Sequence, residues 1–213
     1  MQDDRELYAA WVGGDRAAGS ALVERHFASL ERFFAHKTYG PVDDLVQQTF
    51  LACLEASQDF RGEGSFRAFL FGIARNLLFE HIRRRVRAGR EVPDFATSTI
   101  ADLMPGVSTR LAQESETRQL VLALQRLPLE LQTLLELYYW EELSIDELAP
   151  IFGVPPGTIK SRLFRARGLL REAMERLPGP EEAQRSARTL LEKWLADVRE
   201  KIPGEGDHEP SRR

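Results

Sequence analysis

Residues 144–170, SIDELAPIFGVPPGTIKSRLFRARGLL, constrain the fold of this chain more than any other stretch. Ser144 followed three residues later by Glu147 is a capping box, which predicts that a helix begins directly after Ser144. Gly153 is expected to end that helix, and Pro156 starts a second helix with φ already set for a helical first turn. The spacing therefore predicts two short helices joined by a tight turn.

The second of these helices has one apolar face and one basic face. The apolar face carries Ile159, Leu163, Ala166 and Leu170, and the opposite face carries Gly157, Lys160, Ser161, Phe164, Arg165 and Gly168. Five basic residues and no acidic one occur between Lys160 and Arg171, whereas solvated helices usually mix signs. The pattern predicts a helix-turn-helix whose second helix enters a DNA major groove. An ordinary helical hairpin with a solvated basic face is the alternative.

Charge is unevenly distributed along the 213 residues. The formal net charge of −4 argues against a protein that coats nucleic acid by bulk charge. Residues 61–90 nevertheless contain eight arginines and two acids, and residues 114–147 contain eight acids and two arginines. Local basic patches on an acidic average predict DNA contact that is weak for the isolated protein and made together with a partner.

Cys53 is the only cysteine, which excludes an intrachain disulfide framework and favours a reducing cytosol. No apolar run reaches the roughly 18 residues of a membrane-spanning helix. The acidic start MQDDRE lacks the basic region of a signal peptide. We therefore expect a cytoplasmic protein with no membrane insertion.

The N-terminal third is expected to contain helices over residues 3–12, 15–37 and about 42–57, with Gly13-Gly14 interrupting the first two. The third helix should bury Leu45, Val46, Thr49, Phe50 and Cys53. Its other face carries Asp44, Gln47, Gln48, Leu51 and Glu55 at helical spacing. That face is either plain solvent surface or a docking surface for a partner helix with Leu51 as its anchor. The residues alone leave both open.

A glycine-containing loop, residues 58–65, precedes a further helix from Phe66 to about Arg87. The inward side of this helix is expected to carry Phe66, Phe69, Leu70, Ile73, Leu77 and His81. Aromatic rings near the loop, several arginines and one amide suit single-stranded nucleic acid, since rings stack on bases and arginines bind phosphates. The candidate residues are Phe60, Arg61, Phe66, Arg75, Asn76 and Arg83.

Helical periodicity lapses from residue 88 to about 111, which predicts an extended interdomain linker. Two further helices are expected over 113–127 and 128–141, with an acidic outer face pointing away from DNA. An amphipathic helix is expected at about 181–201, followed by a disordered tail. Packing on the preceding domain and a regulatory role both remain open for this extension. The expected fold class is all-α, with helical domains at 1–90 and 113–177, a linker at 91–112 and a C-terminal extension at 178–213.

Three blocks, at residues 43–56, 60–85 and 127–172, resemble in order and spacing the extracytoplasmic-function group of bacterial RNA polymerase sigma factors. The resemblance implies that Asp44, Gln47, Gln48 and Leu51 bind core RNA polymerase, although the family often has an acid where Gln48 stands. It implies that Phe60, Arg61, Phe66, Arg75, Asn76 and Arg83 melt the minus-ten element and capture a flipped base. It implies that Lys160, Ser161, Arg162, Phe164 and Arg165 read the minus-thirty-five element.

The resemblance implies a non-catalytic specificity subunit with no cofactor or metal. Its expected partners are core RNA polymerase, promoter DNA (duplex upstream and single strand downstream) and an anti-sigma factor. A conventional helix-turn-helix regulator with a helical sensor domain is one alternative, but it leaves the polar face around Leu51 without a role. A helical enzyme is the other. His26, His36, His81 and His208 are scattered, and Asp43-Asp44 has no companion ligands at metal spacing.

Overall fold

The computed structural model describes residues 2–58, 60, 64–86, 93–105 and 117–177, together with Arg185, Thr189 and Glu192. Within those residues the fold is all-α, and pairing between extended segments is limited to one isolated bridge between Thr99 and Pro128. The helices are α1 (Asp4–Val12), α2 (Arg16–Ala35), α3 (Asp43–Glu55), α4 (Phe66–Val86), α5 (Ile100–Leu103), α6 (Thr117–Leu124), α7 (Leu129–Tyr139), α8 (Ile145–Phe152) and α9 (Pro156–Glu175).

Local sequence signals start and end several of these helices as predicted. The Asp15 side chain accepts hydrogen bonds from two backbone amides of the first turn of α2. Both hydrogen bonds of the Ser144–Glu147 capping box are present at the start of α8. Gly153 ends α8 with φ of 63°, a left-handed conformation that glycine adopts without a Cβ penalty.

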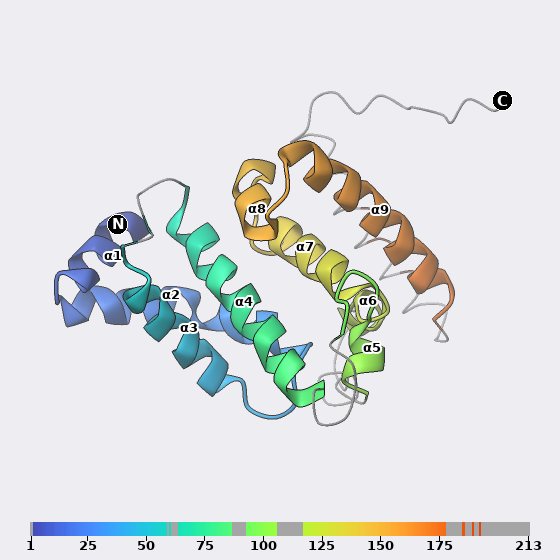
Figure 1. The fold of residues 1–213 in the computed structure, drawn as a ribbon, viewed down its shortest axis with the longest axis horizontal. Coiled ribbons are helices and arrows are strands. Elements are labelled where there is room, and N and C mark those ends of the chain that lie inside the picture. The colour runs from blue at the N-terminus through green and yellow to red at the C-terminus, as the bar shows by residue number, and fades with distance from the viewer. Residues whose placement is uncertain are drawn as a thin grey trace.

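Helices α1–α4 form the N-terminal bundle, in which α1 packs on α2 and α3 on α4 (Figure 1). Large apolar side chains fill its core, among them Leu22, Leu30, Phe34 and Phe71. Helices α6–α9 form the C-terminal bundle, in which α7 and α8 both pack on α9. All four residues predicted for the apolar face of the second helix of the helix-turn-helix are buried there.

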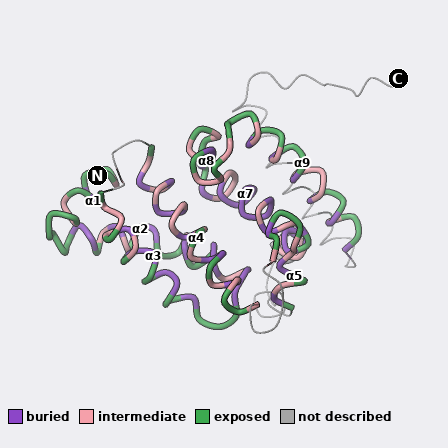
Figure 2. The backbone as a smooth tube through the Cα atoms, in the orientation of Figure 1, coloured by how far each residue is buried: buried purple, intermediate pink, exposed green. Residues whose placement is uncertain are grey.

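Helix α4 is the central helix of the molecule, because it contacts α1, α2 and α3 and also α8 of the C-terminal bundle (Figures 1 and 2). The sequence predicts the wrong inward face for α4, because along most of the helix the buried residue is the one that follows the predicted residue. The buried residues of α4 are Phe66, Ala68, Leu70, Phe71, Ala74, Leu78, Phe79 and Ile82, whereas Phe69, Ile73, Leu77 and His81 are only partly buried. Contact on more than one side explains why the helix has no single apolar stripe.

The segment between the bundles differs from the extended chain that the sequence predicts. Within its described residues, 93–105, it contains the one-turn helix α5, and Phe95, Ile100 and Met104 are buried. The ring of Phe95 packs on that of Phe79 in α4, with centroids 4.6 Å apart. This part of the linker is therefore packed against the bundles.

The helix expected at about 181–201 lies outside the described residues, except for Arg185, Thr189 and Glu192. In the part of the chain that the structure describes, no helix combines the length and the hydropathy that crossing a membrane requires.

Candidate functional site

The first candidate surface is the outward face of α3. Its inward face is buried as predicted, with Leu45, Val46, Thr49, Phe50 and Cys53 in the core. Because a helix turns 100° per residue, this burial leaves Asp44, Gln47 and Gln48 in solvent. Leu51 lies among them with 51% of its surface exposed. An apolar side chain surrounded by acids and amides can act as the anchor of a small docking surface.

The second candidate surface is the outward face of α9. Lys160, Ser161, Phe164 and Arg165 are all exposed, and Phe164 has the largest exposed fraction, 73%, of the large apolar side chains described. Arg162 differs from these four because it is half-buried, and its guanidinium lies 3.4 Å from a carboxylate oxygen of Glu130 in α7. A basic helix face with an exposed ring can donate hydrogen bonds to base edges and pack on thymine methyl groups.

The aromatic candidates near the loop, Phe60 and Phe66, lie in a cluster of rings. Phe66 is 1% exposed and packs 4.9 Å from the ring of Tyr8, measured between centroids. Phe60 is half-buried and packs on Tyr8 and Phe69, at 5.1 Å and 5.0 Å. The ring of Phe66 cannot stack on a base in this arrangement, so the prediction that Phe66 contacts the flipped base is corrected to a core role.

Asn76 and Arg83 lie on one side of α4, two turns apart. Asn76 is exposed, and Arg83 is half-buried with its guanidinium 5.1 Å from the centroid of Phe95. Ten residues of helix separate Asn76 from Phe66, which is about 15 Å along the axis. The structure therefore groups Asn76 and Arg83 but keeps them apart from the aromatic cluster. Arg61 lies outside the described residues.

Arg75 is enclosed between the two bundles. Its guanidinium lies 4.3 Å from the ring centroid of Phe79 and 4.7 Å from that of Phe152 in α8, and it is 3.7 Å from Glu130. Only 13% of its side chain is exposed. Burial lowers the pKa of Arg75, and the negative charge of Glu130 opposes that shift. As folded here, the side chain is not free to meet a phosphate.

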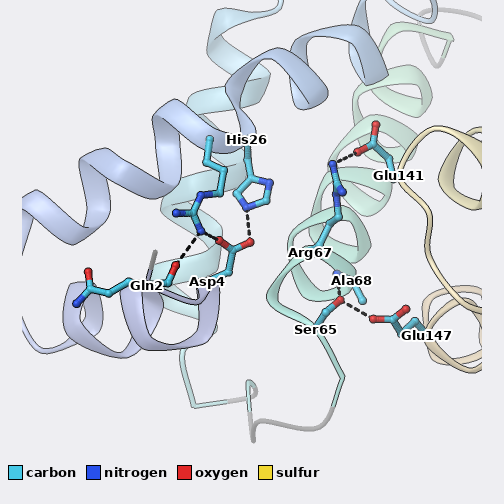
Figure 3. Close-up of polar contacts among 9 residues, drawn as sticks. Gln2, Asp4, His26, Ser65, Arg67, Ala68, Glu141 and Glu147 are labelled. Atoms are coloured by element: carbon cyan, nitrogen blue, oxygen red, sulfur yellow. Dashed lines mark hydrogen bonds and ion pairs between the residues drawn. The ribbon is translucent and has the colours of Figure 1, made fainter.

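Arg75 belongs to a larger set of charged contacts, which we call the interbundle seam. In this seam, three acids of the C-terminal bundle pair with four basic residues of the N-terminal bundle. The pairs are Lys37–Glu136, Arg32–Glu141 at 2.7 Å, Arg67–Glu141 at 3.1 Å and Arg75–Glu130 at 3.7 Å. Figure 3 shows Arg67 of α4 pointing at Glu141, and nearby Ser65 donating to Glu147.

Lys37 and Glu136 form the buried centre of the seam. Their side chains are 0% and 1% exposed. The Lys37 ammonium also donates to the carbonyl oxygen of Phe33, and Gln132 donates to Glu136 at 2.8 Å. Burial raises the pKa of Glu136 and lowers that of Lys37, and each shift is opposed by the partner's charge. These hydrogen bonds satisfy the pair, which buried charges require.

Sequence reasoning missed the centre of the seam because Lys37 and Glu136 are 99 positions apart. It also treated the acids of residues 113–141 as an outer face, whereas Glu130 and Glu136 face the N-terminal bundle. A usable signal was the charge imbalance itself, since the arginine-rich stretch and the acid-rich stretch are complementary in sign. Among the described residues, no group of three or more His, Cys, Asp or Glu side chains is arranged to hold a metal ion.

Comparison with known proteins assigns both bundles to one family. The family model described as Sigma-70 region 2 matches residues 22–88, and that described as Sigma-70, region 4 matches residues 117–170. The ECF RNA polymerase sigma factor SigM of Mycobacterium tuberculosis is 32% identical over 171 residues, which cover 79% of this chain and 83% of that protein. The RNA polymerase sigma-H factor of Pseudomonas aeruginosa is 30% identical over 190 residues, covering 83% and 96%.

Among solved structures, that of CnrH in complex with the cytosolic domain of CnrY superposes with a TM-score of 0.58 and 26% identity, covering 81% of this chain and 97% of that one. The order of the helices, the two matched regions and the shared identity agree with one another. The chain therefore belongs to the extracytoplasmic-function group of RNA polymerase sigma factors.

Proposed function

We propose that this sigma factor binds core RNA polymerase through the α3 surface and promoter DNA through α9 and α4. The observation that carries the proposal is the exposure of two unlike helix faces on separate bundles. One face is polar with a single apolar anchor, Leu51, and the other is basic with an exposed ring, Phe164. A conventional helix-turn-helix regulator has a use for the second face only.

Each surface has a distinct part in the proposed initiation. Asp44, Gln47, Gln48 and Leu51 hold the polymerase. Lys160, Ser161, Phe164 and Arg165 contact the major groove of the minus-thirty-five element, where the Arg165 guanidinium can donate two hydrogen bonds to guanine. Arg162 also contacts this element after its ion pair with Glu130 has broken. The factor is a specificity subunit and supplies no catalytic group.

Downstream, α4 and the loop before it bind the unpaired minus-ten strand. Asn76 offers an exposed amide for a base edge, and Arg83 and Arg61 bind the phosphates. Arg75 joins them after its contacts with Glu130 and Phe152 have opened. Phe60 offers the edge of the aromatic cluster as a stacking surface. Because this site binds only the open strand, its differential affinity shifts duplex DNA toward the melted state.

We propose the domain division that follows from these roles: residues 1–90 for polymerase binding and melting, 91–112 as linker, 113–177 for upstream recognition, and 178–213 as an extension. An anti-sigma factor is a further proposed partner. The net charge of −4 supports weak DNA binding by the chain without polymerase.

Run-off transcription with core RNA polymerase on a library of genomic fragments tests the proposal. The wild-type chain should direct transcription from a subset of fragments that share two elements. The Arg165→Ala variant should lower the yield by about tenfold, the loss expected when one bidentate base contact is removed. Arg176→Ala, at the residue that directly follows α9, is the matched control and should leave the yield unchanged.

A conventional regulator would behave differently in the same assay. It would bind a specific duplex tightly in gel shifts without polymerase, would not co-purify with core enzyme and would not direct run-off transcription. That combination of results would refute the proposed function.

A further inference from the structure

Helix α1 holds the chain on both sides of the connection between α3 and α4. This connection runs over residues 56–65, of which the structure describes 56–58, 60, 64 and 65. Before it, the Tyr8 hydroxyl donates to the carbonyl oxygen of Cys53 in the last turn of α3. After it, the Arg5 guanidinium donates to the carbonyl oxygen of Gly64, two residues before α4 begins. Arg5 and Tyr8 are three positions apart and therefore lie on one face of α1.

The hydrogen bond from Tyr8 satisfies a carbonyl group that α3 leaves without an amide. The last carbonyl groups of a helix have no partner within the helix. At the end of α3, the Ser57 amide donates to the Leu54 carbonyl at 3.2 Å, which leaves the Cys53 carbonyl to another donor. Burial raises the pKa of Tyr8 to about 12, so its hydroxyl stays protonated and able to donate. The end of α3 is therefore fixed to α1.

The ring of Tyr8 also holds the middle of the connection. Tyr8 is 3% exposed, and Phe60 packs on it edge to face, with the planes of the two rings at 90°. Phe60 is the residue to which the proposed function gives the stacking surface for an unpaired base. The position of that stacking surface is thus set by a side chain of α1.

Helix α1 is itself fixed to α2 near both of its ends. Near its start, the Asp4 carboxylate contacts the imidazole of buried His26 at 2.7 Å and pairs with Arg25 (Figure 3). Near its end, the Trp11 indole lies so close to Gly19 that a Cβ there would be 2.4 Å from the ring. A helix held at both ends can serve as a rigid support for the connection.

We propose that Arg5 and Tyr8 are positioning residues for capture of the unpaired minus-ten base, because they hold the α3–α4 connection in the shape that presents Phe60. The inference rests on the proposed function for the identity of the ligand. A connection released from α1 adopts several shapes, and its affinity for the base falls with the fraction that is competent to bind. The loss should be larger for the preferred base, since hydrogen bonds to a base edge need a fixed geometry whereas stacking tolerates any base.

The first test uses holoenzyme reconstituted from core polymerase and the full chain, on a promoter fragment that the wild-type chain transcribes in the run-off library. Each minus-ten base of the non-template strand is changed in turn. The base whose change lowers the run-off yield most is taken as the captured base. Selectivity is the ratio of the yield from the original fragment to the yield from the fragment altered at that base.

Arg5→Ala and Tyr8→Phe should each lower this ratio by about twofold to tenfold, the range for loss of one hydrogen bond. Arg5→Lys should restore most of the ratio, because an ammonium can still donate to the Gly64 carbonyl. Arg16→Ala is the matched control, because it removes the same charge from an exposed position at the start of α2. If Arg5→Ala and Tyr8→Phe both gave the ratio of Arg16→Ala, the proposal would be overturned.

The second test measures the mobility of the connection in the full chain without polymerase, from the line width of a nitroxide spin label on Gln58→Cys, an exposed position. The native Cys53 thiol is buried, which raises its pKa to about 12 and keeps it unlabelled. Arg5→Ala and Tyr8→Phe should narrow the lines while the helical circular dichroism stays intact, and Arg16→Ala should leave the lines unchanged.

Unchanged lines in both Arg5→Ala and Tyr8→Phe would contradict the positioning role. This outcome is distinguishable from failure of the proposed function, because the spectrum is recorded without polymerase or DNA. Failure of the proposed function would instead appear as a wild-type chain that directs no run-off transcription.

Discussion

Leu51 is the residue of the α3 surface whose contribution to polymerase binding can be estimated most directly. Fully burying a leucine side chain is worth about 1.5–3 kcal/mol, and 51% of Leu51 is exposed in the free chain. Covering that half on docking is therefore worth about 0.8–1.5 kcal/mol. Leu51→Ala should raise the dissociation constant for core polymerase by about fourfold to twelvefold. Because the side chain lies outside the core, the free energy of unfolding should change by less than about 0.5 kcal/mol.

The assay is fluorescence anisotropy of the labelled chain titrated with core polymerase, with urea unfolding of the same preparations. Val12 in α1 is the matched control, because it is 47% exposed and lies outside the α3 surface. Val12→Ala should leave the dissociation constant unchanged within about twofold. If Leu51→Ala also stays within twofold, or if both variants weaken binding equally, Leu51 is not an anchor and the outward face of α3 is plain solvent surface.

Two further predictions concern folding. A Cβ on Gly19 would lie 2.4 Å from the indole of Trp11, so Gly19→Ala should destabilise the chain by roughly 1–2 kcal/mol in urea unfolding, whereas Gly168→Ala, with open space around it, should stabilise it by about 0.5–1 kcal/mol. If both substitutions changed the free energy of unfolding in the same direction, the packing described around Gly19 and Gly168 would be wrong. Burial lowers the pKa of His36 from 6.5 to about 3, so the folded chain binds fewer protons than the unfolded chain between those values. Stability should fall on acidification by up to about 1.4 kcal/mol per pH unit, and His36→Phe should remove that part of the slope in urea titrations at pH 7, 6 and 5.

The elements that the sequence predicts well are those set within one or two helical turns. The capping box at Ser144, the left-handed Gly153 and the buried face of α9 all depend on residues that are neighbours along the chain. The same holds for α3, where every residue predicted to be inward is buried. Such signals suffice to identify the helix-turn-helix and the solvent side of α3.

Helix α4 is the element whose buried face the local sequence pattern does not predict. Runs of three apolar residues, at 69–71 and 77–79, give the helix no unique inward face, because each run spans about 200° of its circumference. Contacts with both bundles then decide the orientation, so that Phe71 and Leu78 are buried and Ile73 and Leu77 are half-buried. The assignment of Phe66 to a base failed for a related reason, since an aromatic residue beside a loop serves equally well in a core.

Charged residues present a different problem, because a sequence pattern indicates what a side chain can bind and not what holds it in the folded chain. Arg75 has the chemistry of a phosphate ligand, yet its partner in the free chain is Glu130, which is remote in sequence. The Lys37–Glu136 pair likewise joins residues 99 positions apart, and no local period connects them. Since opposite charges attract in the folded chain as they do between protein and DNA, an arginine-rich stretch and an acid-rich stretch in one chain should be examined first as partners of each other.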